Sequence, residues 1–137
     1  MARTARYIGE QSDVHIDHIW HSPLVRAVQT AEILAAGIGL DEPIVTQPCI
    51  AHPTTLERLA EAIVDVDAHV RGVAVVGHEP TLSVLAGSLL GPTFERSWRG
   101  FDTGQVVALR HDRTQQTWSF GFTIEPDGPR RIDTIGA

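Results

Sequence analysis

The run Val-Ala-Val-Val-Gly at residues 73–77 constrains the fold more than any other stretch, because it is apolar without alternation. A strand with one face in water alternates apolar and polar side chains, whereas a strand covered on both faces reads as a continuous apolar run. The polar turn His78-Glu79-Pro80 follows, and Pro80 suits the first position of a helix that continues to about Leu90. These residues predict a covered strand, a short turn and a helix.

The same organisation occurs earlier in the chain. Residues 16–20, Ile-Asp-His-Ile-Trp, predict a short strand. Ser22 predicts an N-cap and Pro23 the first helical position of a helix that ends near Ala36. The expected apolar face of this helix consists of Leu24, Val28, Ala31, Leu34 and Ala35.

The remaining segments predict further helices and strands around these two units. We expect a helix over 2–10 with Ala5, Ile8 and Gly9 inward, and a weak strand over 43–47. A second helix opens with the capping box Thr54 and Glu57, and its expected buried residues are Leu56, Leu59, Ala60 and Ile63. A loop over 91–104 and a hairpin of strands 105–110 and 117–124 follow. Residues 130–137 read as a tail with solvated Arg130 and Arg131. The expected fold class is α/β, a three-layer sandwich with a mostly parallel sheet and an antiparallel C-terminal edge hairpin, in a single domain over residues 1–137.

Charge and cysteine content exclude several classes of protein. The formal net charge of −6 argues against a nucleic-acid or membrane-surface partner, and all 11 basic residues are arginine. The single cysteine, Cys49, excludes an internal disulfide and a cysteine zinc site. Without a signal peptide or an apolar run of about 20 residues, the sequence predicts a cytoplasmic protein.

The two turns after the predicted strands are the candidate site. Parallel strands point their carboxyl ends the same way, and ligands bind beyond those ends. Arg26 lies one turn inside the first helix, where its guanidinium can join Ser22 and the free N–H groups around an anion. His78 follows the second strand directly. Taken singly, each residue has a simpler interpretation, Arg26 as an exposed arginine on an ordinary capped helix and His78 as a turn histidine.

These stretches resemble a known family. Residues 22–34, Ser-Pro-Leu-Val-Arg-Ala-Val-Gln-Thr-Ala-Glu-Ile-Leu, and residues 75–91, which contain Gly-His-Glu-Pro, are similar to two signatures of the histidine phosphatase superfamily, whose fold is phosphoglycerate-mutase-like. Gly-His-Glu-Pro and residues 101–110, Phe-Asp-Thr-Gly-Gln-Val-Val-Ala-Leu-Arg, most resemble its SixA-like phosphohistidine phosphatase branch. The resemblance extends over residues 1 to about 125.

The resemblance implies a mechanism and roles for particular residues. In the family, a histidine in an Arg-His-Gly signature attacks phosphorus, while the neighbouring arginine, a second arginine and a second histidine bind the phosphoryl oxygens. Here Arg26 matches the second arginine and His78 the second histidine, and Ser22 helps to form the pocket. Glu79 is a further phosphate-site candidate that could assist proton transfer, or else a charge that complements the helix dipole. Neither a metal nor an organic cofactor is implied.

The Arg-His-Gly signature itself does not occur in this sequence. The nearest dipeptide, Arg110-His111, is followed by Asp112, and His78 as nucleophile would lack a separate electrophilic partner. We therefore expect an N-terminally truncated domain whose first, central strand is missing between the strands at 73–77 and 105–110. Either the flanking strands then close up on each other, or another segment, including a partner strand in trans, fills the gap, or the isolated chain is unstable.

Two functions from different classes follow. The favoured one is a phosphatase that hydrolyses phosphohistidine or a related phosphoester through a phosphohistidine intermediate, with its nucleophile absent from this chain, which is then inactive alone. The alternative is a non-catalytic phosphate- or phosphoprotein-binding remnant, or half of a split domain. Strand alternation separates His18 from His15 and His21, which argues against a zinc cluster. In the loop over 91–104, Trp98 and Arg99 could form a wall of the site.

Overall fold

The computed structural model describes residues 1–51 and 55–134, and its helices and strands alternate as expected. The α/β class is confirmed. In chain order the elements are α1 (Ala2–Glu10), β1 (His18–His21), α2 (Val25–Ile38), β2 (Val45–Thr46), the 3₁₀ turn η1 (Pro48–Ala51), α3 (Leu56–Val64), β3 (Val73–Val76), α4 (Thr81–Leu90), α5 (Pro92–Ser97), β4 (Val106–Asp112), β5 (Thr117–Glu125) and β6 (Arg130–Ile132).

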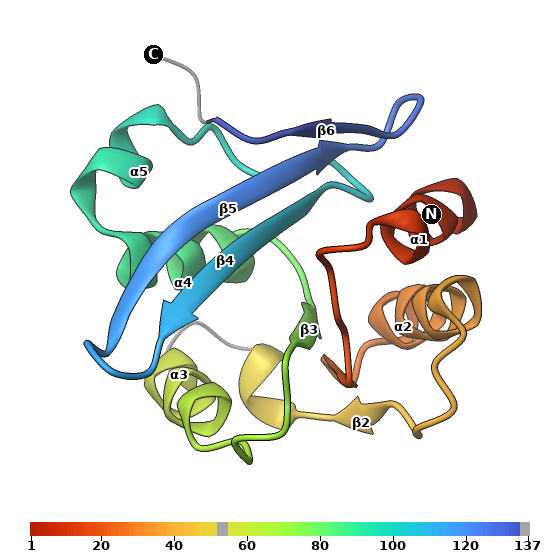
Figure 1. The fold of residues 1–137 in the computed structure, drawn as a ribbon, viewed down its shortest axis with the longest axis horizontal. Helices are drawn as coiled ribbons and strands as arrows, with labels where there is room; N and C mark the ends of the chain where they lie inside the picture. Colours follow the sequence, from red (N-terminus) through yellow and green to blue (C-terminus); the bar gives the residue numbers. More distant parts are fainter. Residues whose placement is uncertain (52–54, 135–137) are drawn as a thin grey trace.

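The strands form two separate sheets. One is parallel, in the order β2-β1-β3, and the other is antiparallel, in the order β4-β5-β6. Figure 1 shows the antiparallel sheet crossing in front of α4, while α1 and α2 lie side by side next to the parallel strands. The predicted hairpin is therefore part of its own sheet and does not pair with the parallel one, because no described strand bridges β3 and β4.

Helices cover both faces of the parallel sheet, as the three-layer prediction requires. Adjacent residues of a strand point to opposite faces, and in β1 Ile19 packs with α1 and α2 while Trp20 packs with η1, α3 and α4. The strand β3 divides in the same way, since Ala74 and Val76 join the first core cluster and Val73 and Val75 join the second. The prediction that both faces of the strand at 73–77 are covered is thus confirmed.

Each side chain of β3 is nevertheless only partly buried. The strand pairs with β1 along one edge, and no described strand pairs with its other edge. Likewise β4 pairs with β5 alone. Side chains of β3 and of β4, among them Val76 and Val106, pack against the same core cluster. Two unpaired strand edges therefore border one core, which agrees with the expected absence of a central strand.

The helix α2 begins later than its sequence predicts. Its N-cap is Leu24, so Ser22 and Pro23 precede the helix, and it ends at Ile38, where Gly39 adopts a left-handed conformation with φ 70°. The hydroxyl of Ser22 accepts the N–H of Leu24 at 3.3 Å instead of capping the first turn. The cap prediction is wrong because this hydroxyl also contacts a side chain from a distant segment, described below.

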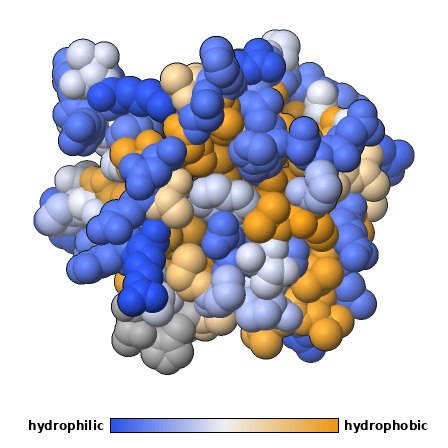
Figure 2. All heavy atoms as spheres, turned by 90° about the horizontal axis from the view of Figure 1, so that it is seen from below, coloured by the Kyte–Doolittle hydropathy of each residue, from blue (hydrophilic) through white to orange (hydrophobic). Residues whose placement is uncertain are grey.

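The buried face of α2 consists of Ala27, Ala31 and Leu34, whereas the predicted core residue Leu24 is 55% exposed. Leu24 falls outside the buried stripe because it precedes the first helical residue. Val25, at 69% exposure, and Val45 of β2 are further exposed apolar side chains. Seen from below, the surface mixes apolar side chains with polar ones (Figure 2). Within the described residues, no helix has the length and apolarity needed to cross a bilayer.

The start of α3 can be compared with its prediction only in part, since Thr54 of the expected capping box lies outside the described residues. Glu57 lies in the first turn, as expected, and the N-cap is Thr55. The Thr55 hydroxyl donates to the carbonyl of Cys49 at 2.7 Å, which ties α3 to η1. Leu56 and Leu59 are buried, so the predicted apolar face is confirmed at these two positions.

Two predictions for the C-terminal third are wrong. Residues 92–97 of the expected loop form the helix α5, and Arg130 and Arg131 begin the strand β6, which pairs with β5. Arg131 is not solvated: its guanidinium lies 4.0 Å from the ring centroid of Phe122 and contacts Asp13 at 2.7 Å. Local sequence could not predict the contact with Asp13, because the two residues are 118 positions apart.

The Asp13–Arg131 pair predicts a loss of stability in acid. The hydrogen bond from Arg131, together with its positive charge, lowers the pKa of Asp13 to about 2. A carboxylate with a depressed pKa stabilises the fold above its unfolded pKa of about 3.9, and this contribution is lost as the pH falls toward 2. Asp13→Asn should therefore be less stable than the parent at pH 6, and the difference should shrink between pH 4 and pH 2.

Urea unfolding at several pH values measures this difference. Glu10→Gln changes an exposed carboxylate at the end of α1 and is the matched control, for which no such convergence is expected. A gap between parent and Asp13→Asn that is as large at pH 2 as at pH 6 would contradict the assignment.

Candidate functional site

The two strand-to-helix junctions meet because β1 and β3 are parallel and in register. His21, the last residue of β1, lies opposite Val76, the last residue of β3. Just beyond this pair, the N–H of Ser22 donates to the carbonyl of Val76 at 3.0 Å. The segments that follow the two strands therefore leave the sheet at the same level, and each leads into a helix.

Side chains from the two junctions are in direct contact. The Oγ of Ser22 lies 2.5 Å from the Nε2 of His78, although the two residues are 56 positions apart. Ser22 is fully buried and His78 half-buried. A hydroxyl can donate to a neutral imidazole or accept from a protonated one. The contact therefore orients the His78 ring in either protonation state.

The backbone around His78 is fixed from two sides. The N–H of Leu82 donates to the carbonyl of His78 at 2.9 Å, which links the residue to the first turn of α4. A Cβ added at Gly77 would lie 2.8 Å from the Cγ2 of Ile50, a fully buried residue of η1. Glycine at position 77 thus allows η1 to pack closely against the turn that carries His78.

Arg26 lies in the first turn of α2, four residues after Ser22, and is exposed. Its side chain has no hydrogen bond or ion pair to another described residue, so the guanidinium retains its full donor capacity. The helices α2 and α4 both begin within a few residues of the Ser22–His78 contact, and helix N-termini attract anions. The arrangement can hold an anion with donors from two elements.

Glu79 is exposed and is engaged with donors of this chain. Its Oε1 accepts the N–H of Ser83 at 3.0 Å, and its Oε2 accepts the Ser83 hydroxyl at 2.5 Å. The N–H of Phe101 also donates to Oε2, at 3.3 Å. The carboxylate thus connects the start of α4 with the segment after α5, and it lies one residue from His78.

His21 also supports the site, although from the sequence it was considered only as a possible zinc ligand. It is buried, and its Nδ1 lies 2.8 Å from the carbonyl of Ser22. Because a carbonyl only accepts, Nδ1 must carry the proton in this bond. The buried imidazole therefore fixes the turn that presents Ser22. A strand-end histidine directly before the predicted turn was the available signal.

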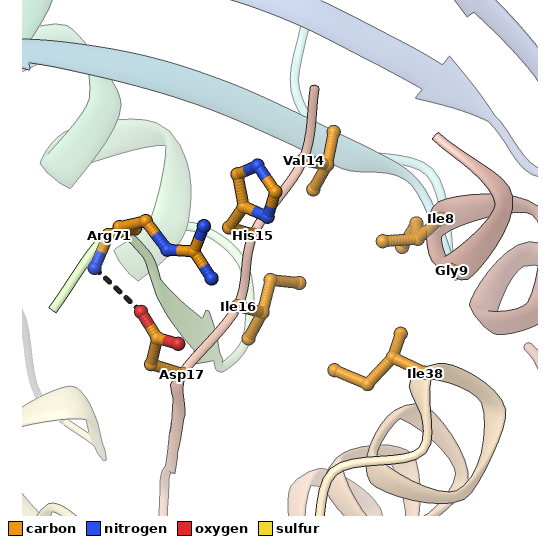
Figure 3. A pocket seen from close by; sticks show the side chains of 8 residues that line it. All are labelled: Ile8, Gly9, Val14, His15, Ile16, Asp17, Ile38 and Arg71. Carbon is orange, nitrogen blue, oxygen red and sulfur yellow. Dashed lines mark hydrogen bonds between the residues drawn. The ribbon is translucent and has the colours of Figure 1, made fainter. Parts of the chain in front are cut away.

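A hollow of about 170 Å³ lies at the opposite end of the parallel strands. Figure 3 shows apolar side chains, including Ile8 and Ile38, on one side of it and His15, Asp17 and Arg71 on the other. His15 and Asp17 precede β1 and Arg71 precedes β3, whereas Ser22 and His78 follow these strands, so the hollow is distinct from the candidate site.

The other sequence candidates lie elsewhere. The ring of His111 on β4 packs against that of Trp118 across the hairpin, with centroids 4.5 Å apart. Among residues 1–51 and 55–134, no group of three His, Cys, Asp or Glu side chains is arranged to hold a metal ion. Cys49 is a free, half-buried thiol.

The fold is a layered α/β fold in which a buried serine and a histidine are in contact at the carboxyl ends of two parallel strands. Residues 2–51, which include Ser22 and Arg26, match the family model of the histidine phosphatase superfamily, branch 1. No curated protein matches the chain significantly.

Solved structures share the fold over most of the chain. The protein histidine phosphatase SixA complexed with tungstate is 20% identical, with 91% of this chain and 80% of that chain covered and a TM-score of 0.73. The putative phosphohistidine phosphatase SixA from Agrobacterium tumefaciens is 22% identical, with 91% and 79% covered and a TM-score of 0.66. A phosphoglycerate mutase from Plasmodium falciparum is 16% identical, with 87% and 79% covered and a TM-score of 0.65.

These findings confirm the resemblance that the sequence predicts. Residues 2–51 match the model of the histidine phosphatase superfamily, and the described chain shares the fold of the SixA and phosphoglycerate mutase structures. At 16–22% identity the structural comparisons establish the fold alone, so substrate and mechanism are argued separately below.

Proposed function

We propose that this protein is a phosphatase of the histidine phosphatase type that acts on phosphohistidine or a related phosphoester. The observation that carries the proposal is the 2.5 Å contact between Ser22 and His78, because it brings two helix N-termini and two predicted phosphate-site residues to one place. Arg26 and His78 bind the phosphoryl oxygens, Ser22 orients His78, and no metal or cofactor takes part. A cytoplasmic location without nucleic-acid or membrane partners stays a prediction from the sequence.

The chemistry suits these residues. A phosphoryl group in transfer spreads negative charge over its three equatorial oxygens, so fixed cationic donors supply most of the catalysis. The planar fork of Arg26 can make two parallel hydrogen bonds to such oxygens. His78 adds a donor from the opposite junction, and the two helix N-termini add free N–H groups.

The nucleophile in this proposal is a histidine outside the 137 residues. Its ring nitrogen attacks phosphorus, a P–N bond forms, and the bond from phosphorus to the substrate's nitrogen or oxygen breaks while that leaving atom takes a proton from solvent water. Water then attacks the phosphohistidine, releases inorganic phosphate and returns the histidine. Both steps conserve charge and need no oxidant or co-reactant.

The unpaired edges of β3 and β4 indicate where the strand that carries this histidine would pair. Both strands contribute to one core, and neither has a described partner on its second edge. An unpaired edge is a template for another strand. We propose that a strand that ends in Arg-His-Gly pairs here, from another segment or from a partner chain, and presents its histidine beside His78.

A non-catalytic role is the second candidate. Two observations favour it, namely that no Arg-His-Gly occurs in the sequence and that one edge of β3 and one edge of β4 lack a partner strand among the described residues. In that case the protein binds phosphate or a phosphoprotein without turnover, or is half of a split domain. The two candidates agree on phosphate binding and differ on hydrolysis.

Complementation with a peptide separates the two candidates. The chain is assayed on a phosphohistidine protein alone and with a short β-strand peptide that ends in Arg-His-Gly. We expect turnover only with the peptide, and none with the same peptide carrying asparagine in place of histidine. Equal turnover without peptide would show that the nucleophile lies within the chain. Phosphate binding without turnover under every condition would favour the non-catalytic role.

A further inference from the structure

The carboxylate of Glu79 connects two segments next to the candidate site. It accepts hydrogen bonds from both the backbone and the hydroxyl of Ser83 and from the backbone of Phe101. The backbone of Gly100 also lies close, since a Cβ added there would be 3.2 Å from Oε2. Glu79 therefore holds the segment 97–101 against the first turn of α4.

Trp98 secures the same segment. Its indole N–H donates to the Oγ of Ser83 at 3.2 Å, so one hydroxyl links the indole to the Glu79 carboxylate. The ring of Trp98 stacks on Phe94, with centroids 5.2 Å apart, and meets Phe101 edge-on at 5.1 Å. The hydrogen bonds and the ring contacts together give the segment one position beside α4.

The hydrogen bonds of Glu79 indicate whether its carboxylate contacts the phosphoryl group or positions other residues. An ionised carboxylate only accepts hydrogen bonds, and the oxygens of a phosphoryl dianion also only accept. The two groups therefore repel each other unless a donor separates them. The donors that Glu79 contacts all belong to α4 and to the segment 97–101.

We propose that Glu79 is a positioning residue that anchors the segment 97–101 beside His78, and that this segment forms a wall that selects the group to which the phosphoryl is attached. The second half of this proposal depends on the proposed function. Arg99, in the middle of the segment, is exposed and has no hydrogen bond or ion pair to another described residue. It is available to the part of a substrate that extends beyond the phosphoryl group.

The anchoring is tested without any ligand. In ¹H–¹⁵N spectra the indole N–H of Trp98 should exchange slowly with solvent in the parent, because it is hydrogen-bonded. Exchange should become at least about tenfold faster in Glu79→Ala and in Ser83→Ala. Glu79→Gln keeps one acceptor oxygen and should give an intermediate rate. Glu61→Ala, an exposed position on α3, should leave the rate unchanged.

Selection is tested with two probes, inorganic phosphate and a peptide that carries a non-hydrolysable phosphohistidine analogue. The ratio of the peptide Kd to the phosphate Kd should rise about tenfold in Glu79→Ala and in Ser83→Ala, and stay constant in Glu61→Ala. If Glu79 instead contacts the phosphoryl group, both Kd values change together and the ratio is constant.

Each outcome decides a different point. An unchanged indole exchange rate in folded Glu79→Ala and Ser83→Ala would overturn the anchoring. Faster exchange with a constant Kd ratio would overturn the selective wall. A parent that binds neither probe would refute the proposed function together with the selective wall, while the exchange rates would still decide the anchoring. Thermal unfolding of every variant identifies those that fail to fold.

Discussion

Replacing Arg26 with alanine is expected to remove most of the stabilisation that inorganic phosphate gives to the fold. The guanidinium is exposed at the start of α2 and has no described hydrogen-bond or ion-pair partner, so its donors are available to a ligand. Hydrogen bonds to charged groups contribute about 1.5–3 kcal/mol each. Loss of the fork should therefore raise the phosphate Kd by about 100-fold, or ~2.7 kcal/mol.

This change has a measurable consequence for unfolding. A ligand at 100 times its Kd stabilises the native state by about 2.7 kcal/mol, whereas the same concentration stabilises a variant with a 100-fold higher Kd by only about 0.4 kcal/mol. Thermal unfolding with and without phosphate measures both values. Arg26→Lys keeps the charge but lacks the planar fork, so an intermediate value is expected.

Arg58→Ala is the matched control, because Arg58 is exposed on α3 and takes no part in the proposed site. It should respond to phosphate like the parent. If phosphate protects Arg26→Ala as much as it protects Arg58→Ala, Arg26 does not bind the anion, and the phosphoryl site must be built from other residues.

The second large effect is expected at Gly72, where an alanine should destabilise the whole parallel sheet. A Cβ at this position would lie 1.8 Å from the carbonyl oxygen of His15, a backbone atom that no side-chain rotation can move away. The carbonyl of Gly72 accepts the N–H groups of Asp17 at 2.9 Å and of His18 at 3.4 Å. Separation of the two segments would break these bonds and the start of the β1–β3 pairing.

We expect Gly72→Ala to lower the free energy of unfolding by about 3 kcal/mol, at the upper end of the range for overpacked sites. This corresponds to a fall in Tm of about 10 °C. Because β3 leads directly into His78, phosphate protection should weaken as well.

Gly128→Ala separates backbone strain from steric overlap. Gly128 has φ 62°, and a Cβ there would meet nothing within 4 Å, so only the strain of the left-handed conformation is added. That strain costs about 1 kcal/mol. Urea unfolding of the two variants should differ clearly, and a Gly72→Ala protein as stable as Gly128→Ala would mean that the residues around His15 relax.

The elements of the site were predictable because each depends on neighbouring residues. The apolar run at 73–77, the turn at His78 and the helix that carries Arg26 are all local patterns. The family model matches the part of the chain that contains Arg26, and the solved structures share the fold around all three. The first helix and the hairpin were predictable for the same reason. The roles of Arg26 and His78 in binding phosphate remain predictions that the experiments above address.

Other features depended on partners far along the chain. Ser22 is a good N-cap by residue type, yet its hydroxyl contacts His78 and the helix begins at Val25. Arg131 looked like a solvated tail residue, yet it binds Asp13 and packs on Phe122. Such contacts depend on how the strands align, which residue type alone does not specify.

Local sequence was sufficient to place most of the helices and strands in order, although not α5 and β6, and to show that no Arg-His-Gly signature occurs among the 137 residues. The tertiary structure alone shows that the strands divide into two sheets, that β3 and β4 each lack a partner on one edge among the described residues, and that Glu79 accepts a hydrogen bond from Phe101, two residues after Arg99. The physical reason is that propensity acts through neighbours in sequence. Strand pairing and side-chain contacts, by contrast, form between backbone and polar groups that only the folded chain brings within hydrogen-bonding distance.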